Sequence, residues 1–312
     1  MNLIRKQYKT LDDYWRARDF LRGLSGPGAR VHANWHVCDL DYWRWHFMEN
    51  VWERPLDELT YWQAADGRTA AVLIQGEPGV CHPITDPAQR TEQLLHDMAE
   101  VAESEFSIAF DDGRTGSFLW VQEGDAMLAS VLEARGFAPP PEGRGTDFYG
   151  WQPLKEAPLA PQIAEGYVLR SMGDATGFPS RSLASWRAFH PGEPDEGADP
   201  EGDWYEVIQR SPSYRRDLDV VAAEEASGDI AAFSTCCFDD VKRSGVLVLV
   251  DTATAHQRQG LGKAVVAECL RRLHRLGAVA AGVTWTEDVP GRLYQSCGFT
   301  DYEIGRAWRK IA

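Results

Sequence analysis

The sequence predicts an α/β protein that contains one fold twice, and three observations support this prediction. Strand-like and helix-like segments alternate in the second half. Two pairs of segments match: "DGRTAAVL" (66–73) with "SGDIAAFS" (227–234), and "LEARGF" (132–137) with "YQSCGF" (294–299). Their offsets of 161 and 162 residues are nearly equal, which indicates a tandem duplication. A Pro- and Ala-rich run at 156–166 has no helical or strand period and predicts a linker.

We therefore expect a first domain at 1–155 and a second domain at 167–312, joined by the linker. The second domain gives the clearer pattern. Its expected elements are a strand at 166–172, helices at 180–190 and 204–210, a hairpin of strands at 218–225 and 230–238, an almost wholly apolar strand at 245–253, a helix at 261–276, a strand at 278–285, a short helix through Leu293 and Tyr294, and a last strand near 302–308. An apolar strand of this kind is typical of burial on both faces. A mixed sheet with helices on both faces follows.

Composition and charge restrict the function classes. The chain has 312 residues, of which 44% are hydrophobic and 25% charged, as in ordinary globular proteins. A net charge of −15 argues against nucleic acid and against anionic membrane surfaces, and favours cationic or amine-bearing partners. No run approaches the ~18 apolar residues of a membrane span, and the N-terminal segment does not resemble a signal peptide. We expect a cytoplasmic protein without membrane or nucleic-acid partners.

The six cysteines form no Cys-x-x-Cys motif. Cys236 and Cys237 are adjacent in a strand-like run, so their side chains should point to opposite faces of the sheet. We therefore expect neither a disulfide framework nor a zinc or other metal site, and we expect the thiols to be reduced.

The motif "QRQGLG" (257–262) lies where the apolar strand ends and a helix begins, and three phosphate-binding interpretations compete for it. A P-loop would need Gly at Gln257 and Ser or Thr at Ala264. A dinucleotide-binding fingerprint would need a third Gly at Val265. Both therefore fail. The remaining pattern is a strand, a loop of the form Gln/Arg-x-x-Gly-x-Gly/Ala, and a helix.

A second motif, "LYQSCGF" (293–299), has a Tyr four residues before Gly-Phe. With these two motifs in order, residues 166–312 resemble the GNAT superfamily of acyl-CoA-dependent N-acyltransferases. The resemblance implies a mixed, mostly antiparallel sheet flanked by helices in each domain, with acetyl-CoA as co-substrate. The duplicated arrangement resembles tandem GNAT proteins of the mycothiol synthase type, in which one half is catalytic.

The loop suits the diphosphate of coenzyme A. Gly260 and Gly262 remove side chains that would hold a diphosphate away from the backbone, and a helix N-terminus offers unpaired N–H groups to an anion. Arg258 and Lys263 add charge. By resemblance, backbone N–H groups at Val250, Asp251 and Thr252 receive the acetyl carbonyl, often beside a β-bulge. The residues expected to bind the cofactor are Val250, Thr252, Gln257, Arg258, Gln259, Gly260, Leu261, Gly262 and Lys263.

The chemistry requires a neutral amine, a stabilised oxyanion and a proton for the departing thiolate. The resemblance assigns the acid to Tyr294, whose phenol suits this role. The general base stays open, because Val248 stands where many members have Glu, and Glu287 stands where they usually have Asn. Asp251, Glu287 and Asp239 are candidates, acting through water. His256, beside the loop, is expected to pack or to touch coenzyme A.

The first domain (1–155) is expected to be a degenerate copy that binds no acyl donor. Its run at 85–103 has no glycine before the helix, and Leu132 stands in place of the Tyr. The aromatic segment "NWHVCDLDYWRWHFMENVWE" (34–53) admits two interpretations: a wall that contacts an amine acceptor, or core packing that docks the two domains.

We therefore expect an N-acetyltransferase that moves an acetyl group from acetyl-CoA to a primary amine of a small molecule. Attack would be direct, in a ternary complex, without a metal or a covalent enzyme intermediate, in a monomer or homodimer. The alternatives are a non-catalytic module that binds CoA or a partner protein, and acetylation of a protein or peptide amine.

Overall fold

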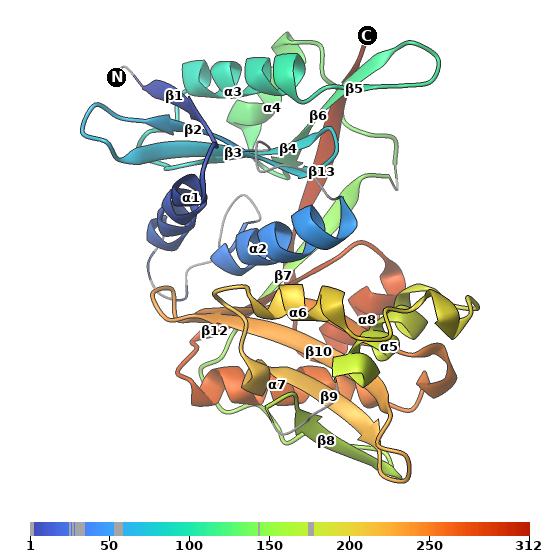
Figure 1. Cartoon of the computed structure of the whole chain (residues 1–312). Helices are drawn as coiled ribbons and strands as arrows, with labels where there is room; N and C mark the ends of the chain where they lie inside the picture. The colour runs from blue at the N-terminus through green and yellow to red at the C-terminus, as the bar shows by residue number, and fades with distance from the viewer. Residues whose placement is uncertain are drawn as a thin grey trace.

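The computed structural model describes residues 3–312 apart from 25, 27, 29–34, 53–58, 143 and 174–177. Figure 1 shows the two halves one above the other. The first half contains β1 (Ile4–Gln7), α1 (Leu11–Gly23), α2 (Val37–Tyr42), the π-helix η1 (Trp43–Val51), β2 (Leu59–Gln63), β3 (Thr69–Glu77), β4 (Val80–Thr85), α3 (Glu92–Glu105), β5 (Ile108–Ala109), β6 (Thr115–Gln122), α4 (Ala126–Ala134) and β7 (Thr146–Pro153).

The second half has the elements that the sequence pattern predicts, with bounds within a few residues of those expected. It contains β8 (Tyr167–Ser171), α5 (Phe178–Phe189), the short 3₁₀ turn η2 (Asp195–Gly197), α6 (Asp203–Gln209), η3 (Arg216–Leu218), β9 (Asp219–Glu224), β10 (Ile230–Asp239), β11 (Ser244–Thr252), η4 (Thr254–His256), α7 (Leu261–Arg275), β12 (Ala280–Trp285), α8 (Asp288–Ser296) and β13 (Asp301–Ile311). The run at 156–166 contains no helix or strand.

The duplication is visible in the order of the elements and in the backbone. β3, β4, α3, β6 and α4 occur in the same order as β10, β11, α7, β12 and α8. Gly67 and Gly228, in the matched hairpin turns, have φ of 84° and 80°, and Gly136 and Gly298, after the matched helices, have 86° and 107°. Left-handed backbone of this kind favours glycine, so both copies keep glycine where the turn requires it. Each half is thus an α/β unit with a mixed, mostly antiparallel sheet.

The two halves exchange their last strands, which makes one continuous sheet. The strand order is β1-β2-β3-β4-β6-β13-β7-β12-β11-β10-β9-β8. β13, from the end of the chain, pairs with β6 of the first half, and β7, from the first half, pairs with β12 of the second. β7 and β13 also pair with each other at the centre. Figure 1 shows both strands running from one half to the other.

Helices cover both faces of the second-half sheet. α7 and α8 pack on one face, where Val265, Cys269 and Leu273 lie at helical spacing and are fully buried. α5 and α6 pack against the other face. This face is also covered by α2 of the first half, which contacts β10 and β11.

The aromatic segment at 34–53 forms α2 and η1, and its ends, Asn34 and Glu53, lie outside the described residues. Trp35 and Trp43 are buried in one core cluster with Cys237 and Val246 of the second half. Core packing, the second interpretation, therefore describes these two tryptophans, because both belong to a core cluster that includes residues of the two halves.

The prediction that the cysteines form no disulfide is wrong for one pair. Cys38 of α2 and Cys237 of β10 form a disulfide, with Cα atoms 6.1 Å apart and 199 residues between them in the sequence. The sequence spacing does not reveal this pair, because only the docking of α2 on β10 brings the two residues together. Cys81, Cys236, Cys269 and Cys297 are free thiols.

His36 lies beside this disulfide, and one donor atom from each of His36, Cys38 and Cys237 falls within 4.8 Å of the others. Both imidazole nitrogens of His36 already have partners: Nδ1 accepts the Cys38 backbone N–H at 3.2 Å, and Nε2 lies 3.0 Å from Ser244 Oγ. The ring is thus fixed as a helix cap.

Among the described helices, none is long and apolar enough to cross a membrane.

Candidate active site

The ladder between β11 and β12 ends part-way along both strands, and we call this end the fork. The parallel pairing runs from Ser244–Ala280 to Leu247–Val283, although β11 continues to Thr252. Residues of β11 are buried up to Leu247 and partly exposed from Val248 onward. The expected burial of this strand on both faces thus holds only for its first part. Beyond the fork, the strand is open to a ligand.

A β-bulge lies at the fork. Thr235 of β10 pairs with Leu249 and Cys236 pairs with Leu247, so Val248 is an extra residue. A bulge disrupts the ladder locally and re-aims neighbouring backbone groups. The bulge lies two residues before Val250, where the resemblance places the first acetyl-binding N–H group. The side chain of Val248 packs against the core cluster that includes α2, and supplies no carboxylate there.

The predicted diphosphate loop leads from β11 into an uncapped helix. Gly260, the N-cap of α7, has φ of 80° and ψ of 4°, and no side chain caps the first turn. Arg258 also has a positive φ, 65°. Gln257 Nε2 donates to the Thr252 carbonyl at 3.1 Å and holds the loop against β11. The first N–H groups of α7 are thus available to an anion.

The two glycines of the motif have different structural roles. A Cβ on Gly260 would meet nothing within 4 Å, so its side is open to solvent. A Cβ on Gly262 would lie 3.3 Å from Thr252 Oγ1 and 3.4 Å from Leu293 Cδ2. Gly262 therefore lets α7 begin close to β11 and α8. Leu261, between them, is buried in the core, which leaves only its backbone for a ligand.

The corresponding loop of the first half is filled by its own side chains. Thr91 Oγ1 accepts the Leu94 N–H at 3.2 Å and caps α3. Arg90 donates to Thr85 Oγ1 at 2.8 Å and forms an ion pair with Asp125, the N-cap of α4. One N–H group of the first turn, of the kind that α7 leaves free, is thus occupied at α3.

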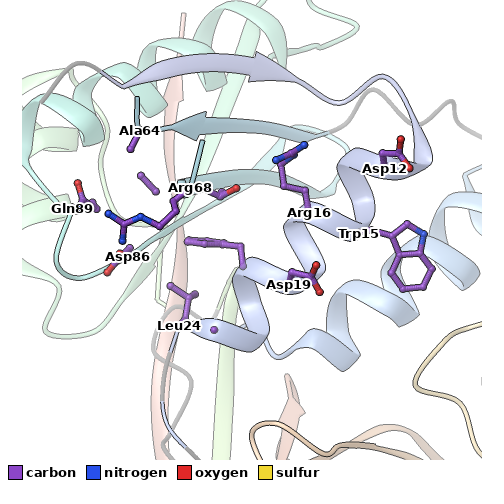
Figure 2. A pocket seen from close by; sticks show the side chains of 13 residues that line it. Asp12, Trp15, Arg16, Asp19, Leu24, Ala64, Arg68, Asp86 and Gln89 are labelled. Atoms are coloured by element: carbon purple, nitrogen blue, oxygen red, sulfur yellow. The ribbon is translucent and has the colours of Figure 1, made fainter. Parts of the chain in front are cut away.

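An open hollow of ≈ 540 Å³ lies beside this loop on the first half. Figure 2 shows that side chains of α1 face those of the β2–β3 turn and of the loop after β4. Its charged lining residues are Asp12, Arg16, Asp19, Arg68 and Asp86. Three carboxylates against two guanidinium groups do not suit a diphosphate.

Tyr294 lies next to the fork, on the α7 side of the sheet. It is 5% exposed, and its ring centroid lies 5.9 Å from that of Trp285 and 6.3 Å from that of Phe299. Burial and, to a lesser extent, the charge of Asp251 raise its pKa. The phenol therefore stays protonated at neutral pH and has a proton to donate.

Asp251 of β11 is partly buried and pairs with Phe233, which packs on the α5 side of the sheet. Burial raises the pKa of its carboxyl group, and a hydrogen bond from the Thr252 backbone N–H to Oδ1, 2.6 Å long, lowers it. Part of the carboxylate is thus occupied by the strand's own backbone. The structure brings Asp251, Thr252, Gly262 and Tyr294 together.

The two other base candidates lie in different places, Glu287 just after the end of β12 and Asp239 at the end of β10. Glu287 is the exposed N-cap of α8, seven residues before Tyr294, which is about 10 Å along a helix. Asp251 pairs with Phe233, near the start of β10, whereas Asp239 is the last residue of that strand. It is 3% exposed and forms an ion pair with Arg22 at 2.7 Å. His256 Nδ1 lies 2.9 Å from Tyr167 Oη, so His256 packs against β8.

One feature of the site escapes sequence analysis, because it comes from the first half. Asp39 of α2 and Tyr149 of β7 line a small cavity with Val246 of β11 and Thr284 of β12. The local pattern around Asp39 indicates a helix start, and nothing in it reveals that this helix docks on the other half.

Comparisons with known proteins agree with this geometry. Residues 183–299 match the acetyltransferase (GNAT) family. The chain carries a GNAT acetyltransferase domain. The matched region includes the fork, the uncapped start of α7 and Tyr294, and it makes this protein an acyltransferase.

Solved structures show the same fold over nearly the whole chain. A tandem GNAT protein from the clavulanic acid biosynthesis pathway is similar with a TM-score of 0.65 at 14% identity, covering 99% of this chain and 98% of that one. A GCN5-related N-acetyltransferase from Sphaerobacter thermophilus has a TM-score of 0.59 at 16% identity, covering 99% and 95%. A GNAT-family acetyltransferase from Colwellia psychrerythraea has 0.57 at 12%, covering 98% and 100%. No curated protein is significantly similar in sequence.

Proposed function

We propose that this protein transfers an acetyl group from acetyl-CoA to the primary amine of a small molecule, by direct attack in a ternary complex. The observation that carries the proposal is the uncapped, glycine-containing start of α7 beside the fork. It combines free backbone donors for a diphosphate with an open strand for the thioester and a protonated phenol at Tyr294.

In this proposal the loop from Gln257 to Lys263 holds the diphosphate, with Arg258 and Lys263 adding positive charge. Both side chains are exposed and belong to the loop itself. Backbone groups of Val250 and Thr252 lie beyond the bulge and receive the thioester. Tyr294 donates the proton that the departing thiolate needs. The acidic net charge of −15 supports a cationic acceptor.

We further propose that the domain at 1–155 binds no acyl donor. The capped start of α3 and the Arg90–Asp125 pair support this. A cytoplasmic location, as a monomer or homodimer, is part of the proposal, although the disulfide between Cys38 and Cys237 is of a kind more common outside the cytosol.

Calorimetric titration with acetyl-CoA, followed by an amine screen that detects free thiol, tests the proposal. We expect one equivalent of acetyl-CoA per chain, and thiol release that depends on a small primary amine. Two equivalents would contradict the assignment of the first half. Binding without release for any amine would instead identify a non-catalytic CoA-binding module, and release only with peptides would identify a peptide acetyltransferase.

A further inference from the structure

The GNAT domain has no carboxylate at the bulge that could deprotonate the acceptor. Val248 occupies that position, and Glu287 is exposed at the far end of α8. Asp251 pairs with Phe233 on the α5 side of the sheet, and Oδ1 of its carboxylate accepts the Thr252 N–H at 2.6 Å. An ammonium group cannot attack a thioester until it loses a proton, so the reaction needs a base on the face of the sheet that the acceptor occupies.

A cavity of ≈ 40 Å³ adjoins the fork on the face that α2 covers. The two strands line this cavity near the end of their ladder, β11 with Val246 and β12 with Val283 and Thr284. His36 and Asp39 contribute from the first half, at the start of α2. Figure 1 shows α2 lying between the halves, next to the second-half sheet. The cavity is therefore built by both halves, at the point where β11 and β12 separate.

We propose that Asp39 of the first half is the general base that deprotonates the acceptor amine of the GNAT domain. This inference rests on the proposed function. Asp39 Oδ2 accepts the His36 backbone N–H at 2.8 Å, which fixes the side chain in a capping box. No other hydrogen bond joins the carboxylate to the described part of the chain. One oxygen is thus held in place while the other is left for the substrate.

The surroundings of Asp39 set its proton affinity. Burial raises the pKa of its carboxyl group to about 7, with a smaller contribution from the charge of Asp41, while the His36 N–H lowers it. Burial keeps His36 neutral by lowering its pKa to about 3. Tyr149 stays protonated, since burial raises its pKa, and Glu303 accepts Gln122 Nε2 at 2.7 Å. Asp39 can therefore exchange a proton near neutral pH.

The transfer balances as follows. The acceptor ammonium gives one proton to Asp39, and the neutral nitrogen attacks the thioester carbonyl from the α2 face. The C–N bond forms and the C–S bond breaks. The thiolate receives the Tyr294 proton and leaves as a thiol. The second proton lost by nitrogen restores the phenol through solvent, and Asp39 releases its proton to solvent. One net proton is released for each acetyl group transferred.

Asp39→Asn in the full-length protein tests this role. The Asn side-chain oxygen can still accept the His36 N–H, so the capping box survives while the base is lost. We expect the kcat for a primary alkylamine at pH 7 to fall about 100-fold, with unchanged affinity for acetyl-CoA. In the unmodified protein, kcat should rise with pH through about 7, because Asp39 must be deprotonated. The kcat of the variant should not show this rise around pH 7.

Asp13→Asn is the matched control. Asp13 holds the same capping-box position in α1, where its Oδ2 accepts the N–H groups of Lys9 and Thr10 at 2.9 and 3.0 Å. The control loses one capping carboxylate, as the test variant does, but outside the cavity. We expect its kcat and pH profile to stay within threefold of those of the unmodified protein.

A weakly basic acceptor separates base catalysis from a structural effect. An aromatic amine is already neutral at pH 7, so Asp39→Asn should reduce its acetylation by less than threefold, whereas a distorted site would slow both amines equally. Equal losses, or an unchanged pH profile for the alkylamine, would overturn the role of Asp39. If the unmodified protein acetylates no amine, the proposed function itself fails. If the unmodified protein is active and Asp39→Asn does not lower its kcat, the role of Asp39 is overturned and the proposed function is not.

Discussion

At the residue scale, the proposed mechanism uses one group from each half of the chain. Tyr294 comes from the GNAT domain and lies on the α7 side of the sheet, among Trp285 and Phe299. Asp39 comes from the first half and lies on the α2 side. The fork lies between them. The proposed acid and the proposed base therefore lie on opposite faces of the sheet.

Tyr294→Phe should lower turnover on the order of tenfold or more, because it removes the proton donor and keeps the buried ring. The affinity for acetyl-CoA should not change. Tyr302→Phe is the control, since its ring also contacts Trp285, 5.5 Å between centroids, but belongs to β13. Thiol release under saturating substrates measures both. Equal turnover in Tyr294→Phe and the unmodified protein would remove Tyr294 from the mechanism.

Some of the site residues could be predicted from sequence and others could not. The spacing of Gly260, Gly262 and Tyr294 is local, and the structure brings the start of α7 next to α8. Glu287 was a candidate by position alone, and its helix places it at the exposed N-cap. Asp39 carries only a helix-start signal, because its contact with the fork arises from tertiary docking.

At the element scale, α3 and α7 show how one fold gains or loses an anion site. Both helices follow a strand and a short loop, but Thr91 caps α3 while Gly260 leaves α7 uncapped. The difference lies in one N-cap side chain and in Arg90, which fills the space beside it. We infer that the first half lost its anion site when the side chains of Thr91 and Arg90 came to occupy the start of α3.

Gly260→Glu tests the loop. A carboxylate at this position repels the diphosphate and projects into the space the ligand needs, so the affinity for acetyl-CoA should fall about 100-fold or more. Gly228→Glu is the control: Gly228 has the same φ of 80°, and a Cβ there also meets nothing within 4 Å. Both variants carry equal backbone strain, so their melting temperatures should shift alike. Equal affinities by calorimetry would refute the loop assignment.

The positions of the second-half elements could be predicted because apolar periodicity is local. The bulge at Val248 could not, since it depends on which residues of β10 lie opposite β11. The same holds for the π-helix of η1 and for the disulfide between Cys38 and Cys237. Each of these features is created by a partner distant in the sequence.

At the scale of the whole molecule, strand exchange makes each half depend on the other. Without β13, the strand β6 keeps β4 but loses its partner at the other edge, and without β7, the strand β12 keeps β11 but loses its other partner. The sequence repeat predicts two similar folds but not their exchange, because β7 and β13 are alike in pattern and either could complete either sheet. Pairing with the other half also exposes fewer strand edges.

Fragments 1–155 and 156–312 should therefore not fold alone, although each contains a complete copy of the repeat. We expect neither to give a cooperative thermal transition by circular dichroism. The control is the intact protein cleaved at a protease site inserted within 156–166: its two pieces should stay associated on gel filtration and keep acetyl-CoA affinity. A cooperative transition and full affinity for isolated 156–312 would contradict this account.

The exchanged strand at the end of the chain also bears on biosynthesis and inheritance. During translation, the first half cannot complete its sheet until residues 301–311 have left the ribosome, so one edge of β6 stays without its partner until almost the entire chain is made. A premature stop codon anywhere before β13 would disable both copies at once. The first half supplies β7 in return, so the second half would still depend on it for its sheet if the first half binds no ligand.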